Sequence, residues 1–119
     1  MKSIIVALLL LVTSVAFGQT RIAVDIDKAS LTWNAPTAGG TVQEYKVKCG
    51  PATGDYTKTT VIGAPTLTAP VRSVIAGPGV WFCVVTAANQ FGESGPSNEI
   101  AFEAGTKPGD PTGLVLTAG

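Results

Sequence analysis

The stretch from Val80 to Phe102 limits what this chain can fold into more than any other part of the sequence. Residues 80–88 alternate so that apolar side chains recur at every second position, which is the spacing of one face of a β-strand. Residues 89–96 are rich in turn formers and interrupt this alternation. A second alternating run follows at 97–103. The pattern predicts a β-hairpin with a loop of several residues.

Earlier parts of the chain show the same period of two in shorter runs. Between the first two runs the apolar positions change from even to odd, which requires a turn or bulge near Asp27-Lys28. Pro70 fits the edge of a sheet or a break, because proline donates no backbone hydrogen bond. No helical period follows residue 18. We therefore expect earlier strands at residues 21–27, 29–34, 42–49, 56–62 and about 71–75.

These short strands and the turns between them predict an all-β fold. The expected architecture is a two-sheet antiparallel sandwich of about seven strands. Its core should contain the apolar side chains that share the inward face of each strand. These are Ile22, Val24, Leu31, Trp33, Tyr45, Val47, Ile75, Val85, Ala87, Ile100 and Phe102.

The N-terminus has the features of a signal peptide. Lys2 places a positive charge near the N-terminus, and residues 4–12 are apolar but too few to span a bilayer comfortably. Small residues precede the expected cleavage site after Gly18. Cleavage after Ala16 and retention as an uncleaved anchor are the alternatives. We expect a secreted protein, located in the periplasm, outside the cell or on its surface, with no stable membrane insertion after cleavage. The expected division is a signal peptide at 1–18, a domain at 19–105 and a tail at 106–119.

Catalysis finds little support in the sequence. The chain contains no histidine, which removes histidine-based catalysis and histidine metal sites. Two cysteines do not suffice for a structural zinc site, and no glycine-rich loop precedes a helical pattern. Asp25 and Asp27 lie two apart on one strand, where they either recruit a cation or, as we expect, face solvent. Eight basic and eight acidic residues balance, so nucleic acid is not an expected partner. We expect no enzyme, no cofactor and no bound metal.

The order of motifs over residues 29–104 resembles a fibronectin type III domain. The segment Leu31-Thr-Trp33-Asn-Ala-Pro36 is similar to the Leu-x-Trp-x-x-Pro of its second strand, and the hairpin at 80–102 is the strongest match. The resemblance implies an immunoglobulin-like sandwich that serves as a non-catalytic binding or adhesion module, with a protein or glycan ligand that the sequence does not identify. One departure is Trp81, where the family usually has a tyrosine whose hydroxyl ties a corner to the backbone. Such a corner is then either packed without a hydrogen bond or rebuilt by other groups.

The cysteine pair is a second departure, because the family commonly folds without a disulfide bond. In this family the strands that contain Cys49 and Cys83 are antiparallel neighbours, and both cysteines share the inward face of their strands. An exported chain folds under oxidising conditions, so a Cys49–Cys83 bridge is expected. Two buried free thiols are the alternative.

The resemblance further places ligand contacts in the loops, which gather at the two ends of such a sandwich. Residues 35–41 and 89–95 should share one end. Phe91 is a large apolar residue at the expected loop tip, where it either contacts a ligand or folds back on its own hairpin. The expected contact residues are Asn89, Gln90, Phe91 and Glu93.

The C-terminal tail contains a second strand-like segment. Residues 107–111 form a stiff linker with two prolines. The following Pro111-Thr-Gly-Leu-x-Leu is similar to the first strand of another fibronectin type III domain. We consider a loose tail or relic of a lost domain, a strand that completes its own sheet, and a strand donated to a neighbouring subunit. Donation would use Leu114, Val115 and Leu116, would form homo-oligomers or filaments, and would make the protein a structural subunit of an extracellular assembly.

Overall fold

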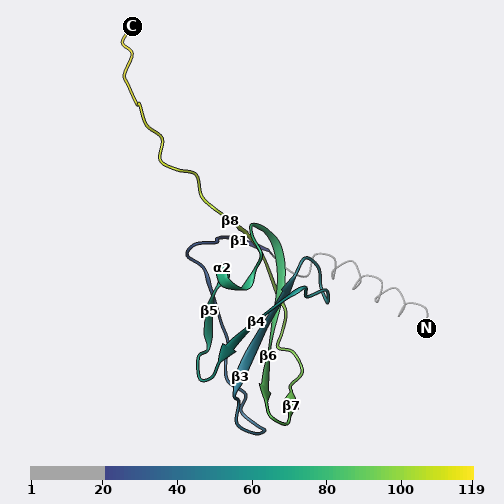
Figure 1. Cartoon of the computed structure of the whole chain (residues 1–119). Helices are drawn as coiled ribbons and strands as arrows, with labels where there is room; N and C mark the ends of the chain where they lie inside the picture. The colour runs from purple at the N-terminus through teal and green to yellow at the C-terminus, as the bar shows by residue number, and fades with distance from the viewer. Residues whose placement is uncertain (1–20) are drawn as a thin grey trace, which may run out of the picture.

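The computed structural model describes residues 21–119, so the expected signal peptide and its cleavage site lie outside the described residues. The described part is a β-rich fold with one short helix, and its strands form two sheets (Figure 1). The elements are β1 (Ile22–Asp25), β2 (Ser30–Thr32), β3 (Glu44–Gly50), β4 (Lys58–Gly63), β5 (Thr68–Pro70), α2 (Val71–Val74), β6 (Gly79–Asn89), β7 (Gly92–Glu93) and β8 (Ile100–Gly105).

The larger sheet has the strand order β1-β8-β6-β3-β4, and β7 pairs with β6 beside this path. The smaller sheet consists of β2 and β5, which are antiparallel. The pair β1 and β8 is parallel, whereas the other pairs of the larger sheet are antiparallel. The chain therefore changes sheets between β1 and β2. The expected turn near Asp27-Lys28 is confirmed: the backbone N–H groups of Lys28 and Ala29 donate to the carbonyl of Asp25 at 3.0 and 2.9 Å.

Apolar side chains from both sheets and from α2 share one buried cluster. Val47 of β3 and Ala69 of β5 are both fully buried, and Val71 and Val74 of α2 pack into the same cluster. Removing this apolar surface from water is the main favourable contribution to folding. The two sheets are therefore held together by a common core.

The strand expected at about 71–75 is wrong. Residues 71–74 form one helical turn, and the strand that pairs with β2 ends just before it, at Pro70. Val71 and Val74 are three residues apart, so one helical turn brings both onto the core face. Pro70 adopts φ −65° at the start of the turn, and its carbonyl accepts a hydrogen bond from the Ser73 hydroxyl at 2.8 Å.

The expected core is partly confirmed. Tyr45, Val47, Ile75 and Phe102 are buried, whereas Val24, Leu31, Trp33, Val85 and Ala87 are half-buried. Two expectations are wrong. Ile22 is 65% exposed on β1, which pairs with β8 alone among the described strands, and Ile100 is 40% exposed.

The central strand β6 is buried on both faces, which its alternation did not predict. Val84 and Thr86 lie on the face opposite Cys83, yet their exposed fractions are only 4% and 5%. The strand is flanked by β3 and β8, and the long side chains of Lys46 and Lys48 extend from β3 over the same face. Lysine stems shield apolar surface while their charged ends remain in water.

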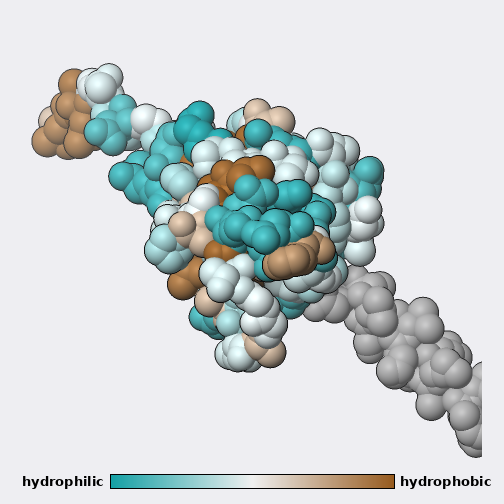
Figure 2. Space-filling model, turned by 60° about the horizontal axis from the view of Figure 1, so that its bottom comes forward, coloured by the Kyte–Doolittle hydropathy of each residue, from teal (hydrophilic) through white to brown (hydrophobic). Residues whose placement is uncertain are grey.

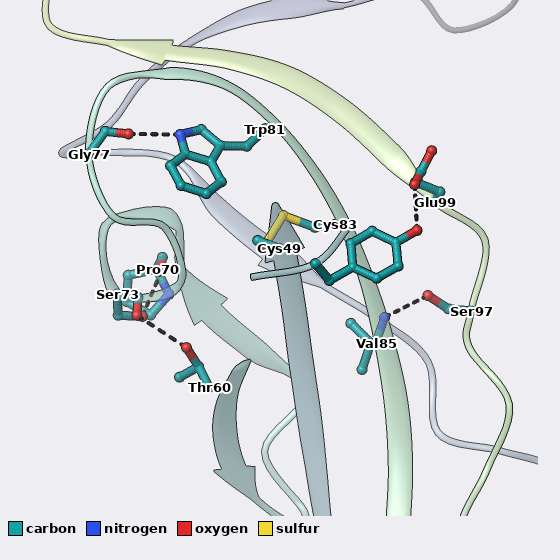
Figure 3. The surroundings of a disulfide bond; sticks show 11 residues. Cys49, Thr60, Pro70, Ser73, Gly77, Trp81, Cys83, Val85, Ser97 and Glu99 are labelled. Carbon is teal, nitrogen blue, oxygen red and sulfur yellow. Dashed lines mark hydrogen bonds between the residues drawn. A yellow bond between two sulfur atoms is a disulfide. The ribbon is translucent and has the colours of Figure 1, made fainter. Parts of the chain in front are cut away.

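Between β7 and β8 the chain leaves the regular ladder but stays beside β6. The hydroxyl oxygens of Ser94 and Ser97 accept hydrogen bonds from the backbone N–H groups of Ala87 and Val85, each at 2.9 Å (Figure 3 shows the second). The bend contains Pro96, which has no N–H for a ladder. Serine side chains therefore replace backbone carbonyls where the edge of the sheet bends.

The expected disulfide bond is present. Register between β3 and β6 places Cys49 directly opposite Cys83, with the two Cα atoms 4.1 Å apart (Figure 3). Both residues are fully buried in the core cluster. The alternative of two free thiols is excluded.

The corner at Trp81 is hydrogen-bonded. The indole N–H donates to the backbone carbonyl of Gly77 at 2.8 Å, four residues earlier in the chain (Figure 3). Tryptophan has a donor but no acceptor, so it can tie the corner only to a carbonyl. The corner is thus neither left without a hydrogen bond nor rebuilt by other groups, because Trp81 itself makes the tie to the backbone.

We predict that reducing the disulfide lowers the free energy of unfolding by about 3–4 kcal/mol, because the bond closes a loop with a sequence separation of 34. Urea unfolding followed by tryptophan fluorescence, with and without reductant, measures the difference. The double variant Cys49→Ala, Cys83→Ala should not respond to reductant. A loss of less than about 1 kcal/mol in the wild type would contradict the prediction.

Candidate functional site

The two loops that the sequence placed together do lie side by side at one end of the molecule. The side-chain amide of Asn89 donates to the backbone carbonyl of Thr41 at 3.0 Å, and Gln43 donates to the side-chain oxygen of Gln90 at 3.3 Å. A hollow of about 160 Å³ lies between the loops. We call residues 35–43 and 89–95 the loop surface.

The tip of the loop surface is a tight turn between β6 and β7. Asn89 pairs with Gly92 across this turn, which leaves Gln90 and Phe91 at the tip. The side-chain oxygen of Asn89 accepts a hydrogen bond from the backbone N–H of Phe91 at 2.8 Å. Gly92 has φ 144°, a conformation that residues with a Cβ rarely adopt. The turn is therefore defined by local geometry rather than by contacts of the Phe91 ring.

Phe91 is 87% exposed and does not fold back onto its own hairpin. Figure 2 brings this end of the molecule forward and shows small, separate brown areas among mainly teal and white residues. An aromatic ring on a braced turn offers a large contact area at a small cost in conformational entropy. The arrangement suits an apolar contact to a partner, with the neighbouring Gln90 amide as a hydrogen-bonding group.

Three of the four expected contact residues have internal contacts. Asn89 and Gln90 connect the two loops, as described above. The carboxylate of Glu93 extends over the outer face of the larger sheet, 2.5 Å from the ammonium of Lys48 and 3.6 Å from that of Lys46. It also accepts a hydrogen bond from the hydroxyl of Thr86 at 2.7 Å. Phe91 is therefore the contact candidate whose side chain points outward, and Gln90 beside it is exposed but accepts the hydrogen bond from Gln43.

These partners stabilise the charged form of Glu93. Hydrogen bonding to Lys48 has the largest effect and that to Thr86 the next, and together they lower the pKa of the carboxyl from its ordinary value of 4.5 to about 2. A carboxyl whose pKa falls on folding contributes stability above its unfolded pKa, and this contribution is lost as the pH falls toward the folded pKa. The sensitive range is therefore between about 4.5 and about 2.

Two other acidic residues, Glu99 and Asp27, also form structural contacts. Glu99 accepts hydrogen bonds from the hydroxyls of Tyr56 at 2.5 Å and Thr53 at 3.0 Å, and the bond to Glu99 is the main cause that raises the pKa of Tyr56. Asp27 pairs with Arg72, whose Nε lies 2.6 Å from the carboxylate. Across residues 21–119 no group of three or more metal-ligating side chains comes together.

A second concave surface was missed by the sequence analysis. A groove of about 430 Å³ lies between β2 and the bent segment before β8, and Leu31, Trp33, Val85, Ser97 and Ile100 are among its lining residues. Its one signal in the sequence was Ile100, which alternation places on the inward face of its strand and which we interpreted as buried. The position of the groove depends on how the two sheets meet, which periodicity does not report.

The C-terminal tail is extended and exposed. Residues 106–119 contain no strand or helix, and Figure 1 shows them leaving the end of β8 and running away from the sheets. Leu114, Val115 and Leu116 are 99%, 76% and 92% exposed. Figure 2 shows the brown end of this segment projecting from the body of the molecule.

Comparison of the chain with protein-family models, with curated proteins and with solved structures finds no match. Within residues 21–119 no helix has the length and hydropathy that a membrane span requires.

We predict that Glu93→Gln makes the protein less sensitive to acid. The free energy of unfolding of the wild type should fall more steeply between about pH 4.5 and about pH 2 than that of the variant, because protonation breaks the Lys48 and Thr86 interactions. Urea unfolding at several pH values measures this difference. Glu103→Gln, at an exposed position on β8, is the control and should retain the wild-type acid profile. Parallel profiles for Glu93→Gln and the wild type would contradict the prediction.

Proposed function

We propose that this chain is a secreted, non-catalytic binding module built on a fibronectin-type-III-like, two-sheet antiparallel sandwich. The strand order supports this architecture: β3, β6 and β8 share one sheet, whereas β2 and β5 form the other. In immunoglobulin-like sandwiches the third, sixth and seventh strands are likewise separated from the second and fifth. The shared core of the two sheets and the motif order in residues 29–104 agree with the same proposal.

Secretion is supported by two independent features. The Cys49–Cys83 bond is of the kind that persists in oxidising compartments outside the cytosol. The N-terminal sequence has the charge, apolar segment and small residues of a cleavable leader. An extracellular binding module accounts for both.

The observation that carries the binding proposal is the 87% exposure of Phe91 at the tip of a braced turn. Binding energy at protein surfaces is concentrated in a few residues, and aromatic residues are enriched among them. The turn is held by Asn89 and by Gly92, so a ligand would meet a preformed contact rather than order a flexible loop. The partner is a protein or a glycan with an apolar face.

A second candidate function is a structural subunit of an extracellular assembly that polymerises through residues 112–119. The exposure of Leu114, Val115 and Leu116 favours it, because adjacent exposed apolar residues often mark interaction sites. In this function the tail provides a strand to a neighbouring subunit.

We predict that Phe91→Ser weakens binding by about tenfold or more, as expected for an aromatic contact residue. The measurement is surface plasmon resonance against ligands that the wild type selects from a glycan array and a peptide-display library. Val61→Ser is the matched control, because Val61 is an apolar residue that is 54% exposed on β4, outside the loop surface. Equal affinity of Phe91→Ser and the wild type, or equal loss in both variants, would contradict recognition through the loop surface.

A further inference from the structure

The groove beside β2 is bounded by unpaired edges of both sheets. Among the described strands, β2 pairs with β5 on one edge only. On the larger sheet, β1 pairs with Phe102–Gly105 of β8 and extends no further along that strand. Before Phe102, the outer edge of β8 has no strand partner among the described residues. There the free edge of β2 and the segment before β8 line the same groove. Exposed strand edges are sites at which further strands add.

Alternate backbone groups of β2 point toward the groove. Leu31 is paired with Ala69 of β5, and the N–H of Trp33 donates to the carbonyl of Leu67 at 3.0 Å. Because ladder bonds in an antiparallel pair alternate, the N–H groups of Ser30 and Thr32 point away from β5. The free edge of β2 thus presents donors and acceptors without a strand partner in residues 21–119.

The floor of the groove is apolar and incompletely covered. Ile100 pairs with Cys83 across β6 and β8, so both side chains lie on the inward face of the larger sheet. Cys83 is buried, yet Ile100 remains 40% exposed. Leu31, Trp33 and Val85, which also line the groove, are each only half-buried. The groove therefore offers uncovered apolar surface to an occupant.

The C-terminal tail offers the apolar side chains and the unpaired backbone groups that could cover this groove. Leu114 and Leu116 are two residues apart, so an extended tail places both on one face and Val115 on the other. Their apolar side chains match the exposed Ile100 on the groove floor, and the tail's backbone groups are free for pairing with β2. Residues 112–116 in extended form span about 17 Å, as do the five residues 30–34.

The tail leads away from the sheets of its own molecule (Figure 1). It continues from the last residue of β8, whereas the groove is lined by Ile100, the first residue of that strand. A return would require a reversal within residues 106–111. Pro108 and Pro111 stiffen this segment and keep it extended. A second copy can present its groove without such a reversal.

We propose that the groove between β2 and Ile100 is an acceptor site for the segment Thr112–Leu116 of a second copy of this chain. The segment pairs with the free edge of β2, and Leu114 and Leu116 enter the groove while Val115 faces solvent. The contact is head-to-tail, so repetition builds chains of subunits. This inference rests on the second candidate function and is independent of recognition through the loop surface.

The first experiment measures the mass of the chain from Gln19 by gel filtration with light scattering over a range of concentrations. We expect concentration-dependent oligomers for the wild type and for Val115→Asp. The donor variant Leu114→Asp, Leu116→Asp and the acceptor variant Ile100→Lys should be monomeric. Circular dichroism and thermal unfolding verify that each variant is folded. A monomeric wild type, or oligomers that survive in the donor variant, would overturn the proposal.

Mixing the two monomeric variants tests the head-to-tail contact directly. The Ile100→Lys chain retains an intact tail and the donor variant retains an intact groove. The mixture should therefore form a 1:1 complex that cannot extend. General apolar association would instead give no complex or a series of larger species, and either result would overturn the proposal.

Hydrogen exchange followed by NMR in this 1:1 complex identifies the edge that is used. The amides of Ser30 and Thr32 in the donor variant should gain at least tenfold protection, whereas those of Leu31 and Trp33, already paired with β5, should change little. A complex without new protection at Ser30 and Thr32 would overturn pairing with β2. If Phe91→Ser loses its ligand while oligomers persist, or the reverse, the two functions are distinguished.

Discussion

The antiparallel pairing of β3 with β6 is the interaction on which the rest of the structure depends. Seven residues of β3 pair with β6 in one register, from Glu44 opposite Ala88 to Gly50 opposite Phe82. A shift of one residue would turn every buried side chain of β3 toward solvent. The Cys49–Cys83 bond locks this register covalently within the core. β4 joins β3, whereas β7 and β8 join β6, and β1 is added through β8.

The same pairing determines where the loop surface lies. β6 continues beyond Glu44, the first residue of β3, into the tight turn. Asn89, the last residue of β6, therefore reaches the loop that precedes β3 and donates a hydrogen bond to the backbone carbonyl of Thr41. Glu93, just beyond the turn, reaches across β6 to Lys46 and Lys48 on β3. The turn is thus braced from both sides, while the Phe91 ring makes no comparable contact and stays exposed. In the proposed binding function, this rigid support presents one exposed aromatic side chain as a preformed contact.

The two sheets are unequal, and this has a consequence at the edge of the molecule. The first strand joins β8 instead of β2, so the two-stranded sheet keeps an open edge beside an apolar groove. The tail, by contrast, exposes apolar side chains and unpaired backbone groups. Both features leave favourable interactions unmade, and one contact between two copies would satisfy them together. The proposed assembly follows from this complementarity.

Periodicity along the sequence was enough to predict the β-rich fold, the sheet-changing turn near Asp27-Lys28 and the hairpin after Val80. These features are local, because side-chain alternation and turn-forming residues act within a few positions. The pairing of Cys49 with Cys83 required knowledge of which strands are neighbours, which came from the family resemblance. The loop tip was predictable because its turn residues are contiguous in the chain.

Other features were decided only by the tertiary structure. Residues 71–74 form a helical turn because Val71 and Val74 fit the core together in that form. Ile100 has the parity of a core residue but remains exposed, since no described strand covers that part of the sheet. Glu93 became an ion-pair partner because β7 lies beside β6, next to the strand that bears Lys48. The sequence by itself determined which side chains share a face of each strand. The packing of the two sheets decided which of those faces are covered, because burial depends on neighbours that are distant in the chain.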